Sequence, residues 1–106
     1  MVNNTQLKLY ILVRKDFSQG NIISQACHVT AEWCKRWQEG NKDWNNETIV
    51  VVSVLNLIHL NYWKEKLELK CLEYSIFCEP DLNNEMTGLA CYTDKKIFDK
   101  LPLWTL

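Results

Sequence analysis

Residues 7–28 read LKLYILVRKDFSQGNIISQACH and contain a strand, a loop and the start of a helix. The run from Leu7 to Val13 is almost continuously apolar, which predicts a strand covered on both faces of its sheet. A charged loop follows, and Ser18 is a suitable N-cap for the helix that comes next. The free N–H groups at such a helix start, here those of Asn21 and Ile22, can bind an anion or an oxyanion.

The rest of the chain continues the alternation of strands and helices. The first helix is expected to reach about Gln38 and to end at Gly40, which is a reasonable C-cap. A second helix is expected to begin after the cap residue Asn56. The expected strands span 48–55, 74–78 and 87–93, the second helix spans 57–69, and a short third helix spans 94–100.

This element order predicts the topology of the sheet. Helical crossovers make the first strands parallel, whereas the last connection, of about eight residues, is too short for a crossover and returns antiparallel. We therefore expect one α/β domain over residues 1–106, with helices packed on a mixed four-stranded sheet. Ligands of such sheets bind beyond the carboxyl ends of parallel strands. Because the polar loops 14–21 and 79–85 both leave such ends, we expect them to line one site.

Composition limits the class of protein. A length of 106 residues allows one core, and a formal net charge of −1 argues against binding nucleic acid mainly by charge. Five cysteines without a Cys-x-x-Cys pair, and only two histidines, disfavour a zinc site and indicate reduced, buried thiols in the cytoplasm. No apolar run approaches the roughly 18 residues of a membrane span, and no signal peptide is recognisable.

The first helix is expected to have an apolar face and an opposite polar stripe. Asn21, Gln25, His28 and Glu32 follow one another at helical spacing and form the polar stripe. The expected apolar face consists of Ile23, Ala26, Cys27, Thr30, Trp33, Cys34 and Trp37.

Two blocks of sequence resemble one known family. Val-Arg-x-Asp at 13–16, Gly-x-Ile at 20–22 and Gln-x-x-His at 25–28 are similar to the type-2 peptidyl-tRNA hydrolases. The block 77–87 resembles the Glu-Pro-Asp-Leu version of short bacterial and phage relatives. The resemblance covers most of the chain. It implies a small α/β protein, often a homodimer, that hydrolyses the ester between a peptide and the 3′ end of tRNA without a metal or another cofactor.

The resemblance also implies roles for particular residues. Glu79 stands where the family has an aspartate implicated in catalysis, and Thr87 lies near the family's downstream threonine. Asn21 occupies the position at which the full-length enzymes have a lysine that stabilises charge at the scissile ester. The matching positions at the strand end and on the helix are Arg14, Asp16, Gly20, Gln25 and His28.

Ester hydrolysis needs a group that activates water and donors that stabilise the oxyanion. Glu79 or Asp81 is the expected base, with His28 as the alternative, and Asn21 is an expected donor. The predicted catalytic residues are Glu79, Asp81, His28, Asn21 and Thr87. The predicted ligand-binding residues are Arg14, Lys15, Asp16, Ser18, Gly20, Gln25, Trp44 and Asn83.

Structural roles are the alternative for several of these residues. Asn21 can simply support the first helical turn, His28 can lie at the edge of the core, and Glu79–Asp81 is a common way to end a strand. Trp44 in a polar loop is instead expected to stack on a base.

Three functions remain open at the level of the sequence. The first is an esterase that acts on peptidyl-tRNA. The second is a catalytically silent module that binds a nucleotide or an RNA end, for example a phage protein that sequesters a nucleotide signal. The third is a structural dimer with a relict site.

Overall fold

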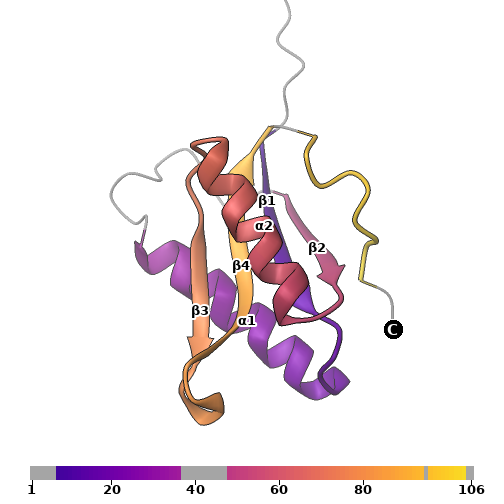
Figure 1. Ribbon diagram of the computed structural model, residues 1–106, viewed down its shortest axis with the longest axis vertical. Coiled ribbons are helices and arrows are strands. Elements are labelled where there is room, and N and C mark those ends of the chain that lie inside the picture. The colour runs from indigo at the N-terminus through magenta and orange to yellow at the C-terminus, as the bar shows by residue number, and fades with distance from the viewer. Residues whose placement is uncertain (1–6, 37–47, 95, 105–106) are drawn as a thin grey trace, which may run out of the picture.

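The computed structural model describes residues 7–36, 48–94 and 96–104, and its strands form one mixed sheet (Figure 1). The strand order across the sheet is β2-β1-β4-β3. Strand β1 pairs parallel with β2 and antiparallel with β4, and β3 pairs antiparallel with β4. The expected mixed sheet, with only the last strand reversed, is therefore confirmed. The strands are β1 (Lys8–Arg14), β2 (Ile49–Val54), β3 (Ser75–Glu79) and β4 (Glu85–Thr93).

Two helices cover opposite faces of the sheet. In Figure 1, α2 (Leu57–Leu69) lies in front of the sheet and α1 (Gln19–Arg36) lies behind it. Leu9, Ile11 and Val13 of β1 pack in the core under α1, whereas Tyr10 and Leu12 pack in the core under α2. Strand β1 is thus buried on both faces, as its continuous apolar sequence predicts.

The predicted apolar face of α1 is only partly confirmed: Trp33 is buried and Ala26 packs against the core, but the centre of the face lies elsewhere. The buried stripe instead consists of Ile22, Gln25, Val29 and Trp33. These positions follow one another at steps of three and four, and the apolar stripe accepts Gln25 because its amide is hydrogen-bonded. The residues expected to be buried but found exposed are Ile23, Cys27 and Cys34.

The predicted position of the polar stripe of α1 is wrong, because one of its members lies on the buried side of the helix. Gln25 is only 6% exposed and lies in the middle of the buried face. Asn21 and His28 are exposed, and Glu32 is half-buried. The His28 ring stacks on Phe77 of β3, so the stripe lies beside the core and does not face away from it. This position directs the stripe toward β3.

The cysteines are not uniformly buried, contrary to the prediction. Cys91 on β4 is buried, Cys78 on β3 is half-buried, and Cys27, Cys34 and Cys71 are exposed. Cys27 and Cys34 lie on the outer face of α1. Cys71 lies in the turn after α2, with a φ of 56°.

The short helix expected at 94–100 is absent from the described part of this segment, where residues 97–100 form a turn. Phe98 is 2% exposed and packs with its ring centroid 5.0 Å from that of Tyr10. The chain then runs along the free edge of β2, where the Trp104 N–H donates to the Val51 carbonyl at 3.0 Å. The edge of β2 thus satisfies backbone polar groups of the tail. A helix that ended before Pro102 would leave this strand edge uncovered.

Some predictions concern segments outside the described residues. They are the core position of Trp37, the helix end at Gln38 and Gly40, and the loop that contains Trp44.

Candidate functional site

The loop after β1 and the turn after β3 meet at one end of the sheet, as the topology predicts. Both β1 and β3 run antiparallel to β4, so their carboxyl ends point the same way. In Figure 1 the start of α1 and the turn after β3 are both at the lower end of the sheet. A cleft of about 190 Å³ lies between them. It is lined by Phe17, Asn21, Gln25, Glu79, Asp81 and Leu82.

A line of side-chain hydrogen bonds runs from the buried sheet to the wall of this cleft. The Thr87 hydroxyl donates to Oε1 of Gln25 at 2.7 Å, and Nε2 of Gln25 donates to Oε1 of Glu79 at 2.8 Å. The backbone N–H of Asp81 donates to Oε2 of Glu79 at 3.3 Å. Both ends of the Gln25 amide are therefore used, which fixes its orientation and that of the Glu79 carboxylate.

Close packing of α1 on β4 makes this line of bonds possible. A Cβ placed on Gly88 would lie 2.3 Å from Cγ2 of Val29, so only glycine lets the helix approach this far. Thr87 precedes Gly88 on β4, and Gln25 precedes Val29 by one helical turn. The approach of the helix thus brings the Gln25 amide within reach of the Thr87 hydroxyl.

A tight turn places the two carboxylates of the cleft. Residues Pro80–Leu82 form a single 3-10 turn after Glu79, and Asn83 and Asn84 follow with φ values of 56° and 61°. Asparagine tolerates this left-handed region better than most residues. The Asn84 N–H donates to the Glu79 carbonyl at 2.9 Å and returns the chain to β4.

The hydrogen bonds also stabilise the ionised form of Glu79. The Gln25 amide, the Asp81 N–H and the nearby His28 lower the pKa of Glu79 below its usual value, so the group is ionised at neutral pH. The His28 ring does not line the cleft but stacks on Phe77, with centroids 4.7 Å apart and the planes 9° from parallel. Glu79 therefore lines the cleft as an ionised carboxylate, whereas His28 is not among the lining residues.

Arg14 is buried and its donors are used within the protein. Its Nε and Nη2 donate to the two carboxylate oxygens of Asp16 at 3.0 and 2.8 Å. Its Nη1 donates to the Met86 carbonyl at 3.0 Å and to the Glu85 carboxylate. The guanidinium lies 4.4 Å from the ring centroid of Phe17. Arg14 thus fastens the loop after β1 to the start of β4 and supports one wall of the cleft.

The remaining predicted residues that the structure describes do not line the cleft. Lys15, Asp16 and Asn83 are exposed, and a Cβ added at Gly20 would meet no atom within 4 Å. Ser18 directly precedes α1, at the predicted N-cap position, and accepts from two N–H groups of the first turn.

The backbone N–H groups of Asn21 and Ile22 are the donors that the sequence predicts for an oxyanion. The Asn21 N–H donates to Oγ of Ser18 at 3.4 Å, and the Ile22 N–H donates to the Ser18 carbonyl at 2.9 Å. They are therefore used within the helix, and the side-chain amide of Asn21 is the donor that α1 leaves at the cleft.

Two lining residues were missed by the sequence analysis. Phe17 and Leu82 are apolar residues inside polar loops, and both are partly exposed. An isolated aromatic side chain in the charged loop 14–18 was the available signal for Phe17. No comparable signal marked Leu82.

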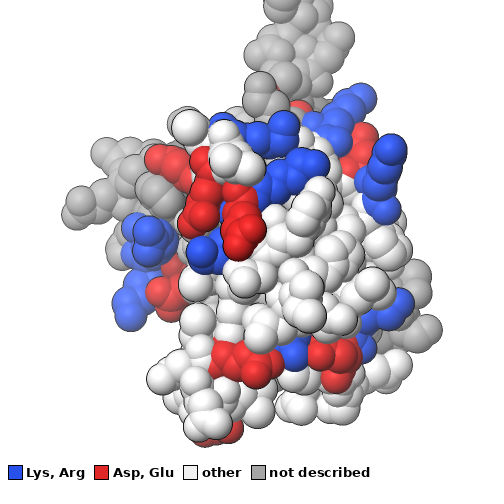
Figure 2. Space-filling model, viewed as in Figure 1, with Lys and Arg blue, Asp and Glu red and all other residues white. Residues whose placement is uncertain are grey.

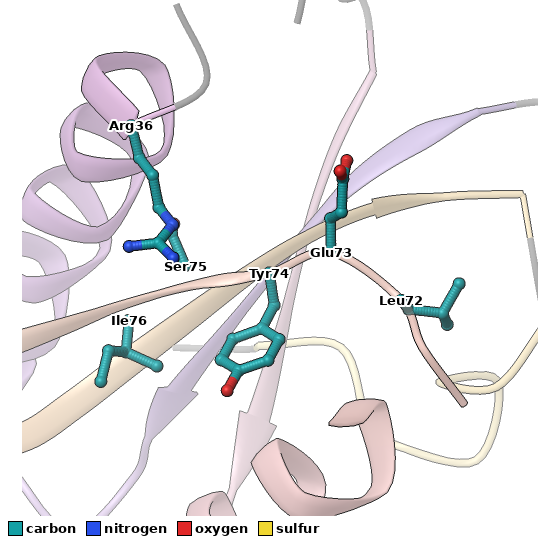
Figure 3. Close-up of a pocket in the computed structure, with 6 residues that line it drawn as sticks. All are labelled: Arg36, Leu72, Glu73, Tyr74, Ser75 and Ile76. Atoms are coloured by element: carbon teal, nitrogen blue, oxygen red, sulfur yellow. The ribbon is translucent and has the colours of Figure 1, made fainter. Parts of the chain in front are cut away.

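A second hollow, of about 300 Å³, lies at the other end of β3. Figure 3 shows Arg36 at the end of α1 with Ser75 close to its guanidinium, while Glu73 and Leu72 point in other directions. The Tyr74 hydroxyl donates to Glu68 and not into the hollow. Its polar groups do not converge, so this hollow is the weaker candidate for a catalytic site.

The mixture of acidic and basic side chains on the surface agrees with the formal net charge of −1. In the view of Figure 2, acidic and basic side chains are intermixed at both ends of the face, and its middle carries no charge. Within the described residues, no three His, Cys, Asp or Glu side chains are grouped to hold a metal ion. No described helix is both long and apolar enough to cross a bilayer.

Comparisons with known proteins agree with this fold. The family model described as peptidyl-tRNA hydrolase PTH2 matches residues 7–93. Among solved structures, the chain is similar to Atu0240, a protein of unknown function from Agrobacterium tumefaciens strain C58, with a TM-score of 0.66 and 15% identity. The match covers 93% of this chain and 98% of that one, and it shows the fold alone. No curated protein sequence matches the chain.

Proposed function

Because the chain belongs to the PTH2 family of peptidyl-tRNA hydrolases, we propose that it hydrolyses the ester between an acyl group and the 3′ end of tRNA. The observation that carries this proposal is the line of hydrogen bonds Thr87–Gln25–Glu79. It holds an ionised carboxylate in a fixed orientation at the wall of a cleft. A general base must be positioned in this way to take a proton from an attacking water.

Two residues of the cleft, Glu79 and Asn21, act directly in this reaction. Glu79 accepts a proton from water as the water oxygen bonds to the ester carbonyl carbon. The bond from that carbon to the ribose oxygen then breaks, and the ribose oxygen receives the proton. The Asn21 amide donates a hydrogen bond to the oxyanion that forms between these two events.

The same residues make the reaction slow. The lowered pKa of Glu79 makes it a weak base at neutral pH. Asn21 offers a neutral donor where the resembled full-length enzymes have a lysine. Since one oxyanion contact is worth about 10²–10³ in rate, a neutral donor in place of a cation gives a modest enzyme.

Electrostatics decide which part of tRNA enters the cleft. None of the six lining residues is cationic, and Arg14 is neutralised by Asp16 and Glu85. The cleft therefore accepts the ester and the ribose hydroxyls, and the phosphates stay outside it. We assign Lys15, which is exposed at the end of β1, to contact with a phosphate.

The absence of a cationic lining residue also favours a second candidate function. A cleft with Asn21 in place of a charged donor can hold the end of an RNA, or a nucleoside, without cleaving it. In that case the protein is a catalytically silent binding module.

Turnover of a defined peptidyl-tRNA tests the proposal. We expect slow release of tRNA by the wild-type protein, loss of release in Glu79→Gln, and a rate at least about tenfold higher in Asn21→Lys. Glu65→Gln, which removes an exposed carboxylate from α2, is the matched control and should behave as wild type.

Two results would contradict this proposal, the first in the role of Glu79 and the second in the activity itself. If Glu79→Gln keeps the wild-type rate, Glu79 is not the base. If neither wild type nor Asn21→Lys turns over, but an RNA ending in CCA raises the melting temperature, the protein is the silent binding module.

A further inference from the structure

The two outer strands of the sheet differ in how their edges are covered. The outer edge of β2 is covered by the tail of the chain, through an antiparallel bridge between Val52 and Leu103 and the bond from the Trp104 N–H to the Val51 carbonyl. Strand β3 is the outer strand on the other side (Figure 1), and among the described residues it pairs with β4 alone. Its free edge can therefore accept another strand.

The hollow of about 300 Å³ lies along this free edge. Residues 72–76 line it together with Arg36. Successive side chains of an extended chain point to opposite faces of a sheet, so a hollow that touches several residues in a row follows the edge of the chain. In agreement, Tyr74 and Ile76 pack toward the core under α2, whereas Arg36 belongs to α1 on the opposite face.

A buried hydroxyl in this hollow lacks a partner. Ser75 lines the hollow and is only 2% exposed, yet its hydroxyl makes no hydrogen bond within the described part of the chain. Buried polar groups in proteins almost always have a partner, so this hydroxyl points to a polar group that enters the hollow from outside. Figure 3 shows the Arg36 guanidinium close to Ser75. Both groups can donate to an oxygen, such as the carbonyl oxygen of a peptide.

The free edge of β3 joins this hollow to the cleft. The strand begins at Ser75, which lines the hollow, and ends at Glu79, which lines the cleft. The backbone between these two residues spans about 13 Å. When the ester lies beside Glu79, a peptide attached to its carbonyl can run back along β3. About the fourth residue of that peptide, counted from the ester, then reaches Ser75.

We propose that the free edge of β3 binds the peptide part of the substrate as an added strand, parallel to β3. This inference rests on the ester-hydrolysis function proposed above and gives the acyl group a binding site. Because the contacts come mainly from the backbone of β3, the site accepts peptides of varied sequence. A second copy of the chain is the competing occupant of this edge. The peptide is favoured because the edge ends at Glu79 in the cleft.

Analogues that cannot be hydrolysed test this inference. They are 3′-amino-3′-deoxyadenosine joined by an amide to either N-acetylalanine or N-acetyltetra-alanine, and calorimetry gives the Kd of each. A further series carries the four-residue peptide with one N-methyl group, placed in turn on each alanine nitrogen. A β-strand directs the N–H groups of only every second residue to the neighbour on one side. Methyl groups at one alternate set of positions should therefore interfere with binding, and those at the other set should not.

We expect the four-residue analogue to bind about tenfold more tightly than the one-residue analogue. Each backbone hydrogen bond strengthens binding severalfold, and ordering the peptide offsets part of this gain. The interfering set of methyl groups should remove the gain. Ser75→Ala should weaken the four-residue analogue alone, by about threefold. Lys35→Gln, an exposed change beside Arg36, is the matched control and should change neither affinity.

Amide hydrogen exchange locates the added strand. Amides of β3 should gain protection when the four-residue analogue binds, whereas amides of β2 should not change. Equal affinities for the two analogues, or N-methyl effects without alternation, would overturn the inference and leave ester hydrolysis intact. Protection of the β3 edge in a dimer without the analogue would assign the edge to a second copy and also overturn it. If no ester is cleaved, the hydrolase function fails, and the analogue series still decides whether β3 binds a peptide.

Discussion

The hydroxyl of Thr87 on β4 donates a 2.7 Å hydrogen bond to Oε1 of Gln25 on α1, and both residues are buried. This bond fixes the amide whose other end holds Glu79. The position of α1 on the sheet therefore fixes the orientation of a carboxylate on a different strand and favours its ionised form. This relationship gives the first prediction.

Removing the Gln25 donor should raise the pKa of Glu79. In Gln25→Leu the hydrogen bond that does most to lower the pKa is lost, so the pKa moves up toward its ordinary 4.5. Because a base acts only when deprotonated, the acidic limb of the pH–rate profile should move to higher pH. Thr87→Val should shift it in the same direction but less, since the amide then keeps its contact with Glu79.

An NMR titration of the Glu79 side-chain carboxyl carbon checks this prediction independently of activity. Glu68, whose pKa is lowered by its contacts with Tyr74 and Lys64, is an internal control in the same spectrum. Its titration should not change in either variant. An unchanged Glu79 titration in Gln25→Leu would show that the amide does not control this carboxylate.

Arg14→Met should destabilise the fold by about 2–3 kcal/mol. The substitution leaves Asp16 and Glu85 without their partner and the Met86 carbonyl without its donor. Loss of one partner of a buried ion pair costs more, about 3–5 kcal/mol, but both carboxylates here are more than one-third exposed. Urea denaturation measures the difference. Lys15→Met, at the exposed neighbouring position, should change stability by less than about 0.5 kcal/mol.

The contribution of Arg14 should depend on pH. Hydrogen bonding to Arg14 lowers the pKa of Asp16 below its ordinary 3.8. A lowered carboxyl pKa gives stability that is present above the unfolded value and is lost as the pH falls through the folded value. The gap in unfolding free energy between wild type and Arg14→Met should therefore narrow as the solution is acidified below about pH 4. A gap that stays constant to pH 2 would contradict the ion pair.

Gly88→Ala should separate α1 from the sheet. The new Cβ would lie 2.3 Å from Cγ2 of Val29 and 3.1 Å from the Leu12 carbonyl oxygen, so the helix must move. Overpacking of this kind costs about 1–3 kcal/mol, measured by thermal or urea unfolding. Gly20→Ala is the matched control, because its Cβ meets open space and alanine favours a helix. Equal losses in the two variants would argue against close packing at Gly88.

The thiols should react in two groups. Cys27, Cys34 and Cys71 are exposed and should react rapidly with a thiol reagent in the native protein. Cys91 is buried, and burial raises its pKa to about 12, so it should react only after unfolding. Mass spectrometry of labelled peptides, with and without denaturant, locates each thiol. Rapid native labelling of Cys91 would contradict the packing of β4.

The sequence by itself determined the α/β class, the mixed sheet and the end of the sheet at which the polar loops meet. These follow from local signals, namely the continuous apolar run 7–13, the cap residues Ser18 and Asn56, and the connection too short for a crossover. Chain connectivity then leaves little freedom for the placement of the strand ends.

Only the tertiary structure decided which side of α1 faces the sheet and what each site residue does. The helix carries small and apolar residues around much of its circumference, so periodicity alone does not select Ile22 and Val29 over Ile23 and Cys27. The close packing of Val29 on Gly88 and the hydrogen bond from the Thr87 hydroxyl to Gln25 decide which side of α1 faces the sheet. Tertiary contacts also make Gln25 a buried link between Thr87 and Glu79. The hydrogen bonds of Arg14 to Asp16, Glu85 and the Met86 carbonyl use its donors within the protein. These roles depend on pairs of atoms more than fifty residues apart in sequence, which no local pattern encodes.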